Sequence, residues 1–371
     1  MSPSSRKVGF THSSIIWWRR VGSAISRRAL GVAPDDRLAL LLGFGRDLAG
    51  AVSVIDPDSR NAGWPDASDE AAAAALRSRA SLSGVQRKLM VVKDGRTFRP
   101  ADPNEISTHL AKLASGQLTD IVELELLTTL ATAALLPGDQ VVDLEVGEVS
   151  GIHEPALIVR RFDRTATGRK LHFEEFNQLL GRRSGDDKYE GSYEDMGGFI
   201  HETSGCLPAE ADRLYRRILA CLLLGNTDAH FKNFAMFHTR DGLRLTPGYD
   251  LVAAATYRQY QTVALVAGGA RNLAIGSLQP KHLVSLGAGY GLSDAAILSA
   301  VEDLGSRLPM AATAIGVAAH GAPALKTELI DLMEKRWKGS FASIGQLLSK
   351  RQKRGGRRKT LPSSGSRSSR T

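Results

Sequence analysis

The sequence is poor in cysteine, in long apolar runs and, at both ends, in acidic residues. Cys206 and Cys221 are the two cysteines among 371 residues. This excludes a disulfide scaffold and a cysteine-rich zinc site, and it fits a reducing compartment. The apolar run near the N-terminus ends after four residues at Arg19-Arg20, too soon for an export signal or a membrane span. We therefore expect a cytoplasmic protein that has no contact with membranes.

The two acid-free ends carry more than the net charge of +9. Residues 350–371 hold nine lysines and arginines without an acid, and residues 1–30 hold six bases without an acid. Residues 31–349 are consequently mildly acidic, so the high pI does not indicate a basic groove on the folded body. We interpret 350–371 as a disordered, solvated tail, with phosphate contact through its basic residues as the alternative.

Composition and periodicity predict an α+β fold with two lobes. With 43% hydrophobic residues, the chain can form a sizeable core. Short strand patterns and one helix occupy 81–163, whereas helical patterns dominate 164–349. A basic start (1–56) and a linker rich in Asp, Pro, Gly and Ser (57–80) precede them.

The individual elements are predicted from alternation, helical spacing and turn residues. We expect strands in 89–100, around a turn at Asp94-Gly95, and in 107–114, 141–149 and 156–164. We expect helices in 122–136, 172–182, 192–203, 208–224, 292–304 and 324–349, with a hairpin turning at Asp241-Gly242.

The most informative motif is GNTDAHFKN at 225–233. Asp228 and Asn233 are five residues apart, and Asp250 follows Asn233 by 17 residues, after the predicted hairpin. Phosphoryl transfer uses one carboxylate to orient or accept the proton of the attacking hydroxyl. It uses an asparagine oxygen and a second carboxylate to hold magnesium. Such residues are also common in turns and helix caps, but the preceding apolar helix, the following strand and the delayed Asp250 favour catalysis.

Three further features each have two interpretations. The loop SLSGVQRK (81–88) can aim backbone N–H groups at phosphates, or it is an ordinary turn. Lys112 either points into the cleft toward phosphates or is an exposed edge-strand lysine. The segment 160–164, RRFDR, is either a hinge that meets an adenine or a surface charge cluster.

Other chemistries lack their residue patterns. The histidines have no H-E-x-x-H or other metal spacing, so we predict no zinc site. The serines Ser81 and Ser83 have no Ser-His-Asp context, which argues against a hydrolase.

Five motifs in one order resemble the HipA-like serine/threonine kinases, the toxin components of bacterial toxin–antitoxin pairs. They are SLSGVQRK, STHLAKL, VRRFDR, GNTDAHFKNF and LTPGYD, and the resemblance covers roughly 81–330. It implies a two-lobed, protein-kinase-like fold with a small β-rich N-lobe and a larger, mostly helical C-lobe.

The resemblance also implies a role for each matching residue. Asp228 would be the catalytic base, Asn233 and Asp250 would bind magnesium, and Ser81 would be autophosphorylated. ATP would be contacted by Ser83, Gly84, Val85, Gln86, Arg87, Lys88, Lys112, Arg160, Arg161, Phe162, His230, Phe231, Lys232, Asn233, Tyr249 and Asp250.

Substrate and partners are likewise implied by the family. Its members phosphorylate aminoacyl-tRNA synthetases, chiefly the glutamyl enzyme, and a helix-turn-helix antitoxin restrains them and links them to DNA. Residues 1–56 would be a remnant of the family's N-terminal subdomain, the rest of which is either supplied by a separate small protein or lost by truncation.

Two positions depart from the family pattern. Leu124 aligns where an Asn-Glu pair is usual, so Glu123 or Glu125 would be the partner of Lys112. Arg160 replaces a common acid, which would affect a side-chain contact of the hinge but not a backbone contact.

Together these observations predict an ATP- and Mg²⁺-dependent serine/threonine protein kinase toxin. The alternatives are a small-molecule phosphotransferase and a truncated, inactive homologue that binds ATP, the antitoxin or nucleic acid.

Overall fold

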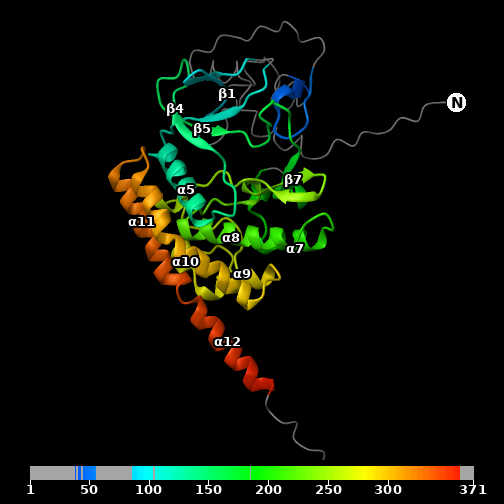
Figure 1. Cartoon of the computed structure of the whole chain (residues 1–371), viewed down its shortest axis with the longest axis vertical. Helices are drawn as coiled ribbons and strands as arrows, with labels where there is room; N and C mark the ends of the chain where they lie inside the picture. The colour runs from blue at the N-terminus through cyan, green and yellow to red at the C-terminus, as the bar shows by residue number, and fades with distance from the viewer. Residues whose placement is uncertain are drawn as a thin grey trace, which may run out of the picture.

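The computed structural model describes residues 38, 41–42, 45–55, 86–102, 105–183 and 185–359 (Figure 1). The predicted linker 57–80 and the end of the chain, 360–371, lie outside these residues. Along the described part of the chain, no helix is both long enough and apolar enough to cross a membrane.

A five-stranded antiparallel sheet forms the first lobe, as the alternating sequence patterns predict. Its strands are β1 (Lys88–Asp94), β2 (Thr97–Pro100), β3 (His109–Lys112), β4 (Leu144–Gly147) and β5 (Ala156–Arg160). The spatial order is β2-β1-β3-β5-β4. β1 and β2 form the expected hairpin at Asp94-Gly95, where Gly95 supplies a φ of 59°.

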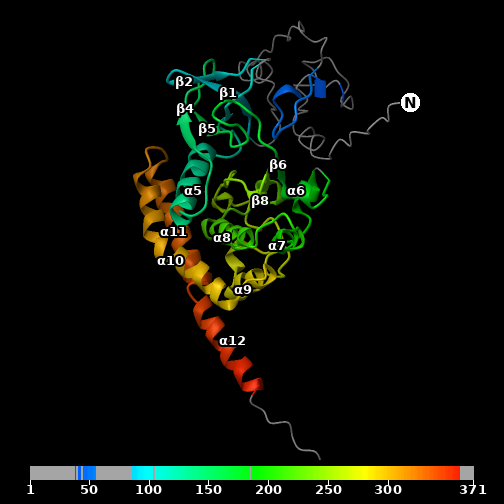
Figure 2. The same ribbon diagram turned by 45° about the vertical axis from the view of Figure 1, so that its right-hand side comes forward.

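Helix α5 (Ile121–Leu135) connects the sheet to the helical lobe. One side of the helix packs Ile121, Val122 and Leu126 against Leu157 and Val159 of β5. The helix also packs against α10 (Asp294–Val317), and both views show it between the sheet and α10 (Figures 1 and 2). Because α5 contacts both lobes, a residue on it can link the sheet to the helical lobe.

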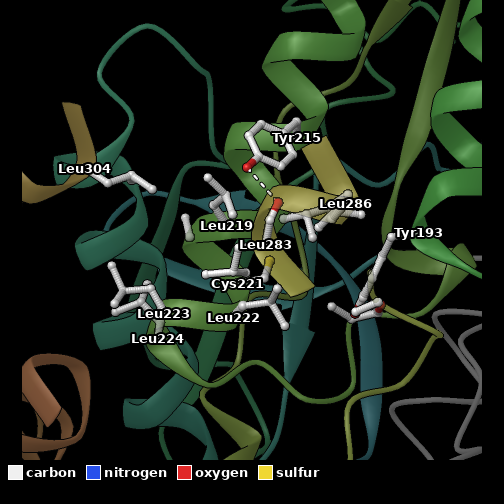
Figure 3. Close-up of a cluster of buried hydrophobic side chains, with 14 of the residues drawn as sticks. Tyr193, Tyr215, Leu219, Cys221, Leu222, Leu223, Leu224, Leu283, Leu286 and Leu304 are labelled. Atoms are coloured by element: carbon white, nitrogen blue, oxygen red, sulfur yellow. Dashed lines mark hydrogen bonds between the residues drawn. The ribbon is translucent and has the colours of Figure 1, made fainter. Parts of the chain in front are cut away.

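The helical lobe surrounds α8, which is almost completely buried. Its helices are α7 (Tyr193–Glu202), α8 (Ala209–Leu224), α9 (Pro280–Gly289), α10, α11 (Pro323–Arg336) and α12 (Ile344–Lys359). Figure 3 shows Leu219 and Leu222 of α8 beside Leu283 and Leu286 of α9, where the hydroxyl of Tyr215 donates to the carbonyl of Leu283 at 3.1 Å; Leu223 and Leu224 belong to the same core. Burial of this apolar surface fixes the end of α8, from which the GNTDAHFKN segment starts.

The helix predicted for 172–182 is wrong, because part of this segment belongs to a second, three-stranded sheet. β6 (Phe173–Glu175) pairs with β7 (Ala235–Thr239), which pairs with β8 (Gly242–Leu245), and only the short α6 (Phe176–Leu179) is helical within 172–182. The amphipathic sequence suits a helix, but pairing with β7 overrides that local preference. The β7–β8 hairpin turns at Asp241-Gly242, as predicted.

The C-terminal helices also differ from the prediction. We did not predict α9, α10 is longer than the expected 292–304, and a π-helical turn at Trp337–Phe341 divides the expected helix 324–349 into α11 and α12. α12 continues to Lys359, so the tail predicted to be disordered from residue 350 begins as a helix. It projects away from the body (Figures 1 and 2).

Residues 45–50 are fixed to the first lobe by a buried ion network. Asp47 lies 2.9 Å from Arg161 and 2.7 Å from Arg164, and Asp163 lies 2.9 and 2.7 Å from the same two arginines. The backbone N–H of Gly50 donates to Asp163 at 2.9 Å. All four charged side chains are at most 7% exposed, so this N-terminal segment is part of the packed fold.

Candidate active site

The GNTDAHFKN segment forms a tight loop after α8. Gly225 ends the helix with a left-handed φ of 82°, and a Cβ there would lie 2.6 Å from the guanidinium of Arg336, so the position requires glycine. The backbone N–H of His230 donates to the carbonyl of Asp228 at 2.8 Å. The side-chain amide of Asn233 donates to the same carbonyl at 3.1 Å. These bonds bring the predicted base and the predicted metal ligand together.

Buried neighbours leave the Asp228 side chain facing outward. Ala229 and Phe231 are fully buried, and the hydroxyl of Tyr193 donates to the carbonyl of Ala229 at 2.9 Å. Asp228 itself is exposed, and its Oδ1 accepts a hydrogen bond from the hydroxyl of Tyr189 at 2.8 Å. A solvent-accessible carboxylate held by a tyrosine is able to receive or orient a substrate hydroxyl.

Lys112 connects the two lobes through two carboxylates. Its Nζ lies 2.5 Å from Oε1 of Glu125 on α5 and 2.7 Å from Oδ1 of Asp250. Burial favours the neutral amine, but the charges of Asp250 and Glu125 outweigh burial and raise the pKa of Lys112 above its ordinary value. Lys112 is therefore a buried cation between two acids, and the edge-strand interpretation is wrong.

Asp250 lies in an unusual backbone conformation just after β8. Its φ of 56° falls in the left-handed region, which residues other than glycine seldom adopt. The side-chain amide of Asn226 donates to the carbonyl of Asp250 at 3.4 Å, and the hydroxyl of Tyr249 donates to the carbonyl of Lys232 at 2.8 Å. These bonds join the Asp250 turn to the loop that holds Asp228.

The described end of the predicted phosphate loop lies beside Lys112. Lys88 starts β1 directly opposite Lys112 in the β1–β3 register, and the carbonyl of Arg87 accepts a hydrogen bond from Leu113 at 2.9 Å. Gln86, Arg87 and Lys88 are thereby placed next to the lysine. Ser81, Ser83, Gly84 and Val85 lie outside the described residues.

The first three residues of the predicted hinge, Arg160, Arg161 and Phe162, lie in different environments. Arg160 is exposed and lies 3.5 Å from Asp143, whereas the side chain of Arg161 is buried in the ion network described above. A nucleotide contact by Arg161 is therefore restricted to its backbone. The ring of Phe162 packs against that of Tyr249 in a tilted arrangement, with centroids 5.1 Å apart, so it is the part of the hinge that reaches the Asp250 turn.

Three loop residues predicted to touch ATP are buried. His230, Phe231 and Lys232 are 1%, 0% and 6% exposed, and Nε2 of His230 lies 2.8 Å from Nζ of Lys188. Their burial favours a role in shaping the loop, and contact with ATP stays a prediction.

Sequence reasoning left Glu125 unassigned and missed Tyr189 and Asn226. Of the two glutamates, Glu125 lies on the buried face of α5 and Glu123 does not. A carboxylate buried within the run VELELL needs a cation as its partner, which favours Glu125. Tyr189 gives no signal in the sequence, because 39 residues separate it from Asp228. Asn226 directly follows the helix end and looks like an ordinary capping residue.

The oxygen atoms of this site suit magnesium. Asn233 uses its NH₂ group toward Asp228, which leaves Oδ1 as a ligand, and Asp250 contributes carboxylate oxygens. Within the part of the chain that the structure describes, Oδ1 of Asn226 and Oε2 of Glu125 are buried without a hydrogen-bond partner. This set of amide and carboxylate oxygens fits a hard cation such as Mg²⁺.

The fold is that of a kinase-like protein, and it brings the predicted site residues together. A small sheet carries Lys112, a helix supplies its glutamate, and a larger helical lobe presents Asp228, Asn233 and Asp250. The chain belongs to the HipA-like family, because the model of the HipA-like C-terminal domain matches residues 80–312.

Relatives by sequence include proteins named as kinases. Y4dM of Sinorhizobium fredii is 32% identical over 293 residues, which covers 74% of this chain and 69% of that protein. The serine/threonine-protein kinase toxin HipA of Shewanella oneidensis is 26% identical over 330 residues, covering 76% of this chain and 71% of that protein. The family resemblance predicted from the motifs is confirmed.

Solved structures show the same fold. HipA of Shewanella oneidensis MR-1, in a complex with HipB and operator DNA, matches with a TM-score of 0.72 at 22% identity and covers 90% of this chain and 87% of that one. The Helicobacter pylori proinflammatory kinase CtkA matches with a TM-score of 0.54 at 12% identity, covering 73% and 93%. These likenesses confirm the predicted two-lobed α+β fold of the kinase type.

Proposed function

We propose that this chain is an ATP- and Mg²⁺-dependent serine/threonine protein kinase. The observation that carries the proposal is the position of Lys112, which meets Glu125 of the first lobe and Asp250 of the second lobe at once. A buried lysine paired with a helix glutamate and next to a metal-binding aspartate is the arrangement that kinases use to hold ATP.

Each residue has a separate task in the proposed reaction. Lys112 would bind ATP phosphates, with Glu125 fixing its direction. Asp228, oriented by Tyr189, would hold the substrate hydroxyl and receive its proton. Asn233 and Asp250 would hold Mg²⁺, which when bound offsets negative charge on the transferring phosphate. The packed rings of Phe162 and Tyr249 would border the adenine side.

We also propose that the kinase is the toxin of a toxin–antitoxin pair. The supporting facts are family membership and the relative named as a serine/threonine-protein kinase toxin. A helix-turn-helix antitoxin would then restrain it and link it to DNA, in keeping with the HipA–HipB–operator complex of the structural relative. The substrate would be a translation component in the cytoplasm, with a glutamyl-type aminoacyl-tRNA synthetase as the first candidate.

Autophosphorylation of Ser81 would regulate this activity. A phosphate adds about −1.5 to −2 charge at neutral pH. If the segment 81–88 binds phosphates as predicted, that charge would oppose the phosphates of ATP and so switch the kinase off.

One experiment separates the protein kinase from the small-molecule phosphotransferase. Purified protein is incubated with radiolabelled ATP and magnesium, either with lysate proteins or with a set of small hydroxyl acceptors. We expect label in protein serine or threonine. Label only in small acceptors would overturn the proposal, as would ATP binding without any transfer, which is the result expected of an inactive homologue.

A further inference from the structure

Two histidines and a glutamate meet on one face of the β6–β7 ladder, at the end where both histidines are exposed. Nε2 of His238 lies 2.7 Å from Oε2 of Glu174, and the rings of His172 and His238 stack with centroids 4.0 Å apart. One potential ligand atom from each of the three residues lies within 4.8 Å of the other two.

Strand pairing fixes this arrangement. The backbone N–H of His238 donates to the carbonyl of His172 at 3.0 Å, which places the two histidines opposite each other. Glu174 is two residues after His172, so both side chains leave the same face of the strand. The three groups therefore approach one another because of the backbone register, without any sequence motif.

The opposite face of the same ladder is filled with aromatic rings. Phe173 and Phe237 alternate with the three polar residues, and both pack edge-to-face on Phe162, at 5.1 and 5.7 Å. This packing holds in place the two strands that carry the polar residues. β6 and β7 lie between the five-stranded sheet and helices α7 and α8 (Figures 1 and 2).

We propose that His172, Glu174 and His238 form a binding site for a divalent transition-metal ion of the zinc class. Two imidazoles and one carboxylate are a common protein ligand set for such ions, with water completing the coordination. One negative charge on the three ligands favours a dication, and partial exposure of His238 and Glu174 gives the ion access.

Binding needs a small local change. The stacked rings turn so that one nitrogen of each points to the ion. The ion takes the place of the proton between Nε2 of His238 and Oε2 of Glu174, which leaves to water if His238 is charged and moves to Nδ1 if it is neutral. The remaining imidazole proton of His238 then resides on Nδ1. Because the ligands come from both strands, the ion would fasten β6 to β7 beneath Phe162. This site is separate from the proposed magnesium site, whose donors are oxygen atoms.

Calorimetric titration of the full chain with Zn²⁺, in excess Mg²⁺, tests the proposal. We expect one zinc ion per chain, and a loss of affinity of at least about tenfold in His172→Ala, His238→Ala and Glu174→Gln. His320→Ala, which removes an exposed histidine elsewhere, is the matched control and should bind zinc as the wild type does.

A second probe excludes misfolding as the explanation. Co²⁺ bound by the wild type should give visible absorption bands that the three variants lack, while their circular dichroism stays unchanged. Zinc should also raise the unfolding temperature of the wild type and of His320→Ala only. Equal zinc binding by wild type and variants, or no saturable binding by the wild type, would overturn the proposal.

Discussion

The Nζ atom of Lys112 lies 2.5 Å from Oε1 of Glu125, and both side chains are almost completely buried. The lysine comes from β3 and the glutamate from α5, so the pair fixes the helix against the sheet. Asp250 approaches the same lysine at 2.7 Å from the helical lobe. The Nζ atom of Lys112, which the proposed function assigns to ATP binding, therefore contacts both lobes.

Lys112→Met should abolish most activity and also destabilise the fold. We expect kcat/KM to fall by about 10²–10³ through loss of a phosphate contact. The buried carboxylate of Glu125 would lose its cation, which costs about 3–5 kcal/mol of unfolding free energy. Urea unfolding and steady-state kinetics measure the two effects.

The double variant Lys112→Met with Glu125→Leu separates these effects. It should recover most of the stability and none of the activity, whereas the exposed Lys93→Met serves as a control that changes neither. Full activity in the stable double variant would contradict the assigned role of Lys112.

Asp228→Asn should stop the reaction and leave the fold intact. The side chain is exposed, so stability should change little, whereas loss of the proton acceptor should lower kcat by about 10²–10⁴ with little change in the KM for ATP. Tyr189→Phe should lower kcat less, by about tenfold, because it removes only the orienting hydrogen bond. An Asp228→Asn protein with wild-type kcat would refute the assignment.

Asn233→Ala and Asp250→Asn should each raise the magnesium concentration needed for half-maximal activity. Asn233→Ala removes an oxygen ligand in the proposed metal site, whereas Asp250→Asn replaces a charged carboxylate ligand by a neutral amide of the same size. The magnesium dependence of the rate, measured at fixed ATP, checks this. Asp241→Asn, in the exposed hairpin turn, should leave the curve unchanged; unshifted curves in both site variants would disprove the metal assignment.

Asp163 should contribute stability that depends on pH. Burial would raise the pKa of this carboxyl, but Arg161 and Arg164 outweigh burial and lower it. A lowered native pKa means that the contribution is present above the unfolded value, about 3.9, and is lost as pH falls through the native pKa. Asp163→Asn should therefore be less stable than the wild type by about 3–5 kcal/mol at pH 7.

The difference between wild type and Asp163→Asn should shrink below about pH 4, where the carboxyl of the unfolded wild-type chain begins to bind a proton, and should continue to shrink until the native carboxyl is also protonated. Asp143→Asn removes only an exposed ion pair with Arg160 and should cost less than about 1 kcal/mol at either pH. A constant difference for Asp163→Asn from pH 7 to pH 3 would contradict the proposed network.

Local sequence patterns predicted the elements whose preferences agree with their packing. The hairpin at Asp94-Gly95, the helix α5 and the apolar α8 were predicted close to their observed bounds. The segment 172–182 was not, because Phe173–Glu175 pairs with a strand more than 60 residues away. Such distant pairing leaves no periodic trace in one sequence.

In the site, too, residues close together in the sequence could be predicted, whereas contacts between residues far apart in the sequence could not. Asp228, Asn233 and Asp250 were predicted from their spacing along the chain, which matches what phosphoryl transfer needs. The sequence did not decide whether Glu123 or Glu125 is the partner of Lys112, and the structure shows that it is Glu125. The spacing of His172 and His238 gave no reason to predict a metal site, since 66 residues separate two side chains that the β6–β7 register places face to face.

Intact mass spectrometry of the purified protein after incubation with ATP and magnesium tests the central claim most directly. The account predicts a gain of phosphate in the wild type, mapping to Ser81, and no gain in Asp228→Asn or Lys112→Met. Equal phosphate gain in all three proteins would contradict the assigned catalytic site. No gain in the wild type, together with no transfer to lysate proteins or to a glutamyl-type synthetase, would contradict kinase activity itself.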